Sequence, residues 1–174
     1  MSQLDSGSCE PVVTCDKLSI YLNDHLAGAT LGLELAKRSR ASNRGTPLGD
    51  FLDRLAREIA EDRETLKSLM AELGIRSDPV KTYGAWAAEK VGRLKLNGQL
   101  RGYSPLSRLV ELEGLKAGIN GKRSMWGALE RVLGTDSPGF DFAELASRAD
   151  RQEAEVEEHR LAAAEVALAR SRAA

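Results

Sequence analysis

The sequence is poor in cysteine, proline and aromatic residues, with two cysteines, five prolines and 5% aromatics in 174 residues. Cys9 and Cys15 both lie near the N-terminus and are too few for a disulfide framework. No Cys-x-x-Cys spacing or matching histidine pair of the kind that binds a metal accompanies them. With few aromatic side chains, the core must consist mainly of Leu, Ala, Val and Ile, which is the composition of packed helices.

A long hydrophobic run and a leader sequence are also missing. The most apolar window, residues 26–36, is too short to span a bilayer and contains Glu34. The first fifteen residues have neither the basic region nor the apolar stretch of a signal peptide. We therefore expect a cytoplasmic protein that does not contact a membrane.

The net charge is only −1, but basic residues gather in the middle of the chain. Residues 79–131 contain ten Lys or Arg and four Glu. No helix-turn-helix spacing and no ladder of arginines and aromatics accompanies them, so we do not expect a nucleic-acid partner. We interpret these side chains as solvated helix faces, with a contact to phosphates or an acidic partner as the alternative.

Apolar residues recur at helical spacing along most of the chain, and no alternating pattern predicts a strand. Helix starts are marked by a capping residue followed by proline, or by a capping box: Thr46-Pro47, Asp78-Pro79, Ser104-Pro105, and Asp141 with Glu144. The pattern predicts five helices, over residues 16–40, 47–73, 79–96, 105–133 and 141–170. We expect the fourth to be interrupted near residues 118–121, where two glycines occur.

Two glycines, Gly28 and Gly32, lie in the middle of the first predicted helix, with Ala27 and Ala29 beside them. Glycine lowers helix stability relative to alanine, so we expect a packing reason for both. The stretch of small residues predicts that a neighbouring helix approaches closely.

The predicted helices form two hairpins. The first two long helices are joined by a short turn and must be antiparallel neighbours, and the last two are likewise close in sequence. The segment between the hairpins carries the shorter helix, which we expect to pack outside the four-helix core or across its end. The expected organisation is a flexible arm, residues 1–14, followed by a single helical bundle domain, residues 15–174.

This layout, with YLNDHLAGATLGLELAKR at residues 21–38 and AREIAEDRETLKSLM at residues 56–70, resembles the ferritin-like superfamily. The resemblance implies an all-α fold: an antiparallel four-helix bundle with an extra helix in the crossover connection. The sequence departs from that family in its metal ligands, because it contains no Glu-x-x-His motif. Leu22 stands three residues before His25, and Val156 three before His159. Oxidase or iron-storage chemistry is therefore not carried over.

Five polar residues fall on inner helix faces and form the candidate site: His25, Glu58, Asp62, Glu113 and His159. Across the first hairpin, facing residues have numbers that sum to about 87, which places His25 opposite Asp62. One hypothesis is a structural hydrogen-bonded pair of His25 and Asp62, because a buried polar group needs a partner. The alternatives are a metal site of mixed imidazole and carboxylate, suited to Fe, Mn or Zn, and catalysis without a metal.

We therefore expect a helical bundle without a complete di-iron site or other cofactor, acting by binding or by self-association. The alternative is a metalloprotein with a divergent site for Fe, Mn or Zn in the bundle core. The first helix also carries apolar residues beyond its inner face, namely Ile20, Leu26, Leu31 and Leu35. More apolar surface than one face can bury predicts a homodimer with the first hairpin as the interface.

Overall fold

A computed structural model describes residues 12–77, 103–134 and 139–169 of the chain. These residues form four helices: α1 (Val12–Ser42), α2 (Pro47–Glu72), α4 (Pro105–Leu133) and α5 (Phe142–Leu168). No strand occurs within these ranges, so the all-α prediction is confirmed for the described part of the chain. The helix predicted over residues 79–96 lies outside the described residues.

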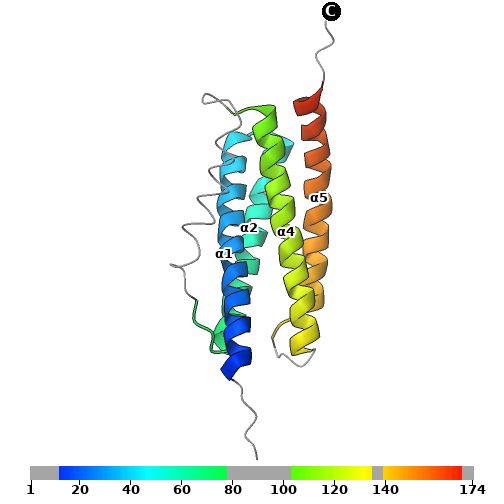
Figure 1. The fold of residues 1–174 in the computed structure, drawn as a ribbon. Coiled ribbons are helices and arrows are strands. Elements are labelled where there is room, and N and C mark those ends of the chain that lie inside the picture. The colour runs from blue at the N-terminus through cyan, green and yellow to red at the C-terminus, as the bar shows by residue number, and fades with distance from the viewer. Residues whose placement is uncertain (1–11, 78–102, 135–138, 170–174) are drawn as a thin grey trace, which may run out of the picture.

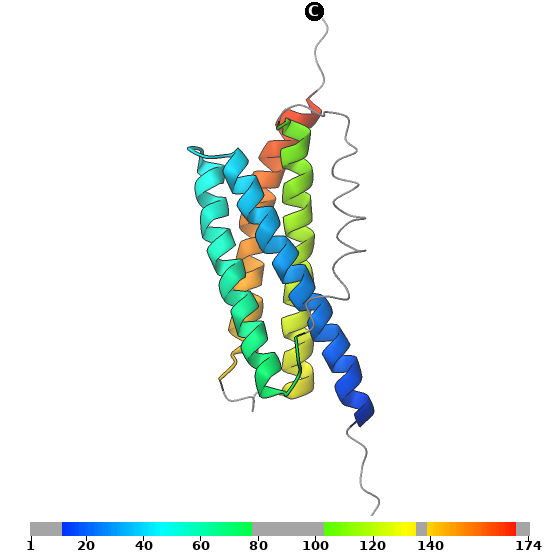
Figure 2. The ribbon, with the colours of Figure 1, turned by 90° about the vertical axis from the view of Figure 1, so that its left-hand side faces the viewer.

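The four helices pack side by side, with the chain running one way in α1 and α5 and the other way in α2 and α4 (Figure 1). Contacts join α1 to α2, α4 to α5, α1 to α4 and α2 to α5. Each helix is therefore antiparallel to both of its neighbours. The second view shows that α2 ends at one end of the bundle and α4 begins at the other (Figure 2).

The predicted starts of α2 and α4 are confirmed by their capping hydrogen bonds, whereas the start predicted at Asp78-Pro79 lies outside the described residues. The Thr46 hydroxyl accepts from the Gly49 N–H at 3.2 Å, and Pro47 opens α2. The Ser104 hydroxyl accepts from the Ser107 N–H at 3.1 Å in the same way before α4. These side chains satisfy N–H groups that the first turn of a helix leaves without a backbone partner.

One predicted helix start and one predicted interruption are wrong. Helix α1 begins at Val12, within the segment expected to be a flexible arm. Helix α4 continues through Gly118 and Gly121 without interruption. A glycine inside a helix costs only about 1 kcal/mol. Burial of Ile119 and Met125 on the same helix offsets that cost.

The turn between α1 and α2 is tight. Gly45 adopts a positive φ of 73°, a conformation that glycine accepts readily. A Cβ placed on Gly49 would lie 2.2 Å from the Asn43 carbonyl oxygen, so only glycine fits there. The Asn43 side chain also donates to the Tyr103 hydroxyl at 2.8 Å, which links this turn to the residues just before α4.

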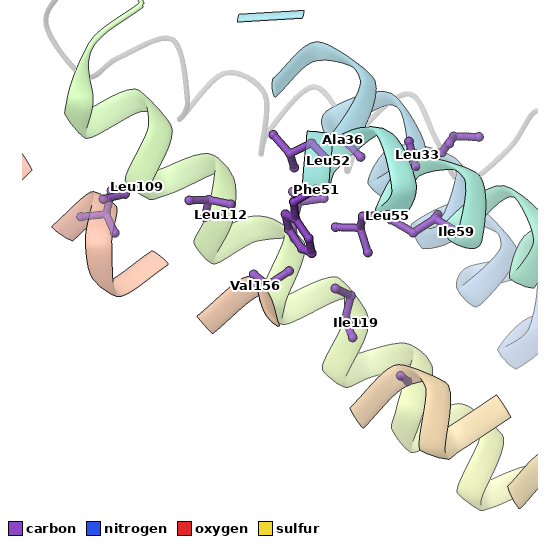
Figure 3. Close-up of a cluster of buried hydrophobic side chains, with 14 residues drawn as sticks. Leu33, Ala36, Phe51, Leu52, Leu55, Ile59, Leu109, Leu112, Ile119 and Val156 are labelled. Carbon is purple, nitrogen blue, oxygen red and sulfur yellow. The ribbon is translucent and has the colours of Figure 1, made fainter. Parts of the chain in front are cut away.

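The core consists of two hydrophobic clusters along the bundle. One gathers side chains of all four helices, among them Leu33, Leu52, Leu112 and Val156 (Figure 3). The other includes Leu22, Leu69, Trp126 and Phe142. In α2 the two clusters meet at Asp62, which lies between Ile59 of the first and Leu66 of the second. In α4 they meet at Lys122, between Ile119 and Met125. A polar layer therefore separates the two clusters.

Candidate functional site

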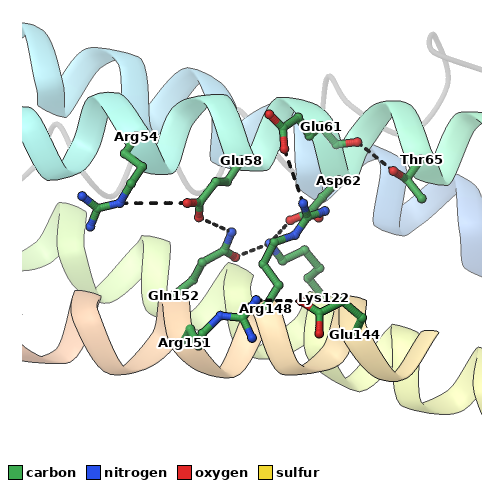
Figure 4. A network of polar contacts seen from close by, with 10 residues as sticks. All are labelled: Arg54, Glu58, Glu61, Asp62, Thr65, Lys122, Glu144, Arg148, Arg151 and Gln152. Carbon is green, nitrogen blue, oxygen red and sulfur yellow. Dashed lines mark hydrogen bonds and ion pairs between the residues drawn. The ribbon is translucent and has the colours of Figure 1, made fainter. Parts of the chain in front are cut away.

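The polar layer centres on Asp62, whose side chain is only 3% exposed. One carboxylate oxygen accepts a hydrogen bond from the Lys122 ammonium, and the other accepts one from the Arg148 guanidinium. These three charges come from three different helices, α2, α4 and α5 (Figure 4). A buried carboxylate is stable only with such partners, because removing it from water is costly.

Gln152 extends this network along α5. Its side-chain oxygen accepts from Lys122, and its side-chain nitrogen donates to Glu58 at 2.8 Å. At the more exposed end of the network, the Arg54 Nε lies 4.0 Å from the Glu58 Oε1. The Gln152 amide thus links the Lys122 ammonium to a second carboxylate, that of Glu58. Both polar atoms of the amide have a hydrogen-bond partner.

The ammonium of Lys122 is largely buried within the layer. Burial lowers the pKa of its ammonium, and the negative charge of Asp62 acts in the opposite direction. The Lys122 side chain is 13% exposed. This residue belongs to the basic segment that the sequence analysis interpreted as solvated, and at this position that interpretation is wrong.

The predicted pairing of Asp62 with His25 is wrong. Asp62 is buried and paired as expected, but within the described residues its partners are Lys122 and Arg148. The ring of His25 instead packs edge-on against Tyr21, with 4.5 Å between ring centroids. Burial lowers the pKa of His25, and the nearby Asp24 partly opposes this effect.

The remaining predicted site residues are dispersed. Glu58 belongs to the polar layer, whereas Glu113 is exposed and lies 3.8 Å from Arg160 rather than pointing inward. His159 packs its ring against Phe51 with 4.5 Å between centroids, and burial lowers its pKa. Within residues 12–77, 103–134 and 139–169, no group of three or more His, Cys, Asp or Glu side chains is arranged to hold a metal ion.

A cavity of about 80 Å³ lies between α1, α2 and α4, beside the polar layer. Its walls are mainly apolar, with His25, Asp62 and Lys122 as the polar side chains. The apolar and small lining residues are Gly28, Ala29, Gly32, Ile59, Leu66, Leu115, Gly118, Ile119, Met125 and Trp126. A site that is mostly apolar with a few placed polar groups has the character of a small-molecule pocket.

Glycines create the open space in this cavity. A Cβ built on Gly28, Gly32 or Gly118 meets no atom of the described residues within 4 Å. The expectation that Gly28 and Gly32 allow a neighbouring helix to approach closely is therefore wrong. The glycines leave volume unfilled on two helices that contact each other, α1 and α4.

Two side chains at the cavity, Trp126 and Lys122, each have an N–H group with no hydrogen-bond partner among the described residues. Trp126 lines the cavity, and its buried indole N–H has no hydrogen-bond partner among the described residues. Lys122 donates to Asp62 and Gln152, which accounts for two of its three N–H groups. Both oxygens of Asp62 already accept a hydrogen bond from a cation.

Lys122, Arg148 and Gln152 belong to this site although the sequence pattern did not predict them there. Gln152 carried the clearest signal, because it interrupts an otherwise apolar inner face of the last helix. Lys122 and Arg148 carried none, since long basic side chains mostly lie at the surface.

None of the described helices is both long enough and apolar enough to cross a membrane. No protein-family model, no curated protein and no solved structure matches this chain.

Proposed function

We propose that this protein acts by binding, and that its ligand is a small molecule held in the cavity between α1, α2 and α4. The observation that carries the proposal is the open space beside the half-buried Gly28 and Gly32, bordered by the largely buried ammonium of Lys122. Gly28 and Gly32 are only half-buried and Gly118 is exposed, so the pocket of about 80 Å³ opens toward solvent on the glycine side. A small molecule can therefore enter it and reach the charged layer, while the apolar walls bury its body.

We further propose that the chain is a ferritin-like bundle whose centre holds an ion-pair network instead of a di-metal site. Two antiparallel hairpins support this proposal, as does the placement of the end of α2 and the start of α4 at opposite ends of the bundle. In such a bundle, cofactor sites are built from side chains that face one another across the core. Here that position is occupied by Asp62, Lys122 and Gln152.

A titration with 1-butanol tests the binding function, with the indole N–H resonance of Trp126 as the reporter. We expect a saturable shift in the wild type, because Trp126 lines the cavity. The Gly32→Leu variant adds a side chain to open space at the cavity wall and should weaken binding at least tenfold.

Gly127→Leu is the matched control, because Gly127 is an exposed glycine within α4 that also has nothing within 4 Å but does not line the cavity. This variant should bind like the wild type. Equal binding by both leucine variants, or no saturable shift in the wild type, would refute the binding function. Circular dichroism confirms that each variant keeps its helices.

A further inference from the structure

We propose, resting on the binding function above, that the cavity takes the carboxylate of a small aliphatic acid and that Lys122 is its anchor. The ammonium donates to Asp62 and Gln152 within the polar layer, and one N–H remains for an occupant of the cavity that Lys122 lines. A hydrogen bond from an ammonium to a carboxylate is among the stronger ones in proteins.

The polar wall selects against a cationic ligand. Among the described residues that line the cavity, Asp62 is the only acid, and each of its oxygens already accepts from a cation, Lys122 or Arg148. A ligand ammonium would have to share one of these oxygens and would lie close to the positive charge of Lys122. Two positive charges that lie close together repel strongly in a poorly solvated site.

His25 supplies a second polar group on α1. Its ring contacts Tyr21 and has no hydrogen-bond partner among the described residues, although it lines the cavity. A neutral imidazole offers one N–H donor. Two donors from different helices, Lys122 on α4 and His25 on α1, suit the two oxygens of a carboxylate.

The other walls require an apolar body on the ligand. Ile59, Leu66, Leu115 and Ile119 surround the rest of the cavity with aliphatic side chains. Burial of each methylene group against such walls contributes about 0.8 kcal/mol. The volume of about 80 Å³ restricts the buried portion to a short chain.

Three probes of equal chain length test the ligand class: butyrate, 1-butanol and butylamine, titrated at neutral pH against the Trp126 indole resonance. We expect butyrate to bind roughly tenfold or more tightly than 1-butanol, because a hydrogen bond to a charged group is worth more than one between neutral groups. Butylamine should bind most weakly. This comparison uses the wild type alone and so does not depend on how a variant folds.

The Lys122→Met variant tests the anchor. It should lose the preference for butyrate and still bind 1-butanol, which shows that the cavity is intact. Lys116→Met is the matched control, because Lys116 lies on the same helix, pairs with Glu157 at 2.8 Å and does not line the cavity. That variant should keep the preference.

Each outcome has a distinct meaning. Equal binding of butyrate and 1-butanol in the wild type would overturn the carboxylate assignment and leave the binding function standing. A preference for butyrate that survives in Lys122→Met would overturn the role of Lys122. The absence of binding by all three probes would overturn the binding function as well.

Discussion

Asp62 is a buried carboxylate with two cationic partners, and its loss should be more harmful than the loss of a surface acid. Asp62→Ala leaves the positive charges of Lys122 and Arg148 close together in a poorly solvated layer. We expect a loss of about 3–5 kcal/mol in the free energy of unfolding, measured by urea denaturation. Asp53→Ala, which removes ion pairs with half-exposed or exposed arginines, should cost less than about 1 kcal/mol.

A double-mutant cycle identifies the partner of Asp62. The losses from Asp62→Ala and Lys122→Met should be strongly non-additive, because both variants remove the same ion pair. The losses from Asp62→Ala and His25→Ala should couple much more weakly, because no hydrogen bond joins these side chains in the described residues and they share only the cavity. Non-additivity in the His25 cycle, with additivity in the Lys122 cycle, would contradict the observed network.

The two histidines make stability depend on pH near neutrality. Burial lowers the pKa of both His25 and His159 below the value of 6.5 that applies to the unfolded chain. Just below pH 6.5 the unfolded state therefore binds more protons than the folded state. The free energy of unfolding has its highest value from this source above pH 6.5 and decreases as the pH drops below it.

Urea denaturation at about pH 7.5 and about pH 5 checks this dependence. His25→Gln should reduce the loss between the two values. The half-buried Glu157, whose pKa is lowered from 4.5 to about 2 by Arg160 and Lys116, affects stability mainly at lower pH, where its unfolded form takes up a proton. An unchanged loss in both His25→Gln and His159→Gln would show that other groups carry it.

The centre of the site could be predicted from the sequence only in part. Asp62 is correctly expected on an inner face, because it interrupts an apolar stripe. The partner of Asp62 could not be predicted, since a hairpin turn sets the register of α1 against α2 but not of one hairpin against the other. Lys122 and Arg148 lie 60 and 86 residues away from Asp62 in the chain.

At the scale of the helix, local chemistry predicts the starts well and the interiors less well. Thr46 and Ser104 cap their helices as expected, because capping depends on a few neighbouring residues. The glycines of α4 were expected to break the helix, yet tertiary packing holds it continuous. The crossover segment, residues 78–102, lies outside the described residues, so the prediction of its helix stays a prediction.

Glycine-to-alanine substitutions should change stability in opposite directions at different sites. Gly32→Ala and Gly127→Ala place a methyl group in open space and should raise the free energy of unfolding by up to about 1 kcal/mol. Gly49→Ala places it against the Asn43 carbonyl and should lower that free energy by roughly 1–3 kcal/mol. Thermal denaturation of the three variants measures these changes in stability, and a stabilising effect of Gly49→Ala would contradict the tight turn.

At the scale of the whole molecule, self-association stays a prediction. Of the apolar residues expected at a dimer interface, Leu26 is buried in the bundle and Leu35 packs against the core, whereas Ile20 is 63% exposed. We expect a homodimer mass by light scattering at high micromolar concentration, and a monomer for Ile20→Lys. Val132→Lys, at an exposed position on α4, is the control and should remain dimeric. A monomeric wild type would contradict the prediction.

The antiparallel arrangement of every neighbouring pair of helices also has an electrical consequence. Each helix carries a dipole with its positive end at the N-terminus, so adjacent dipoles in this bundle oppose one another. Positive and negative helix ends therefore alternate around each end of the bundle, and their fields cancel within a short distance. An ion arriving at either end meets almost no net attraction from the backbone, which leaves the attraction of charged ligands to individual side chains.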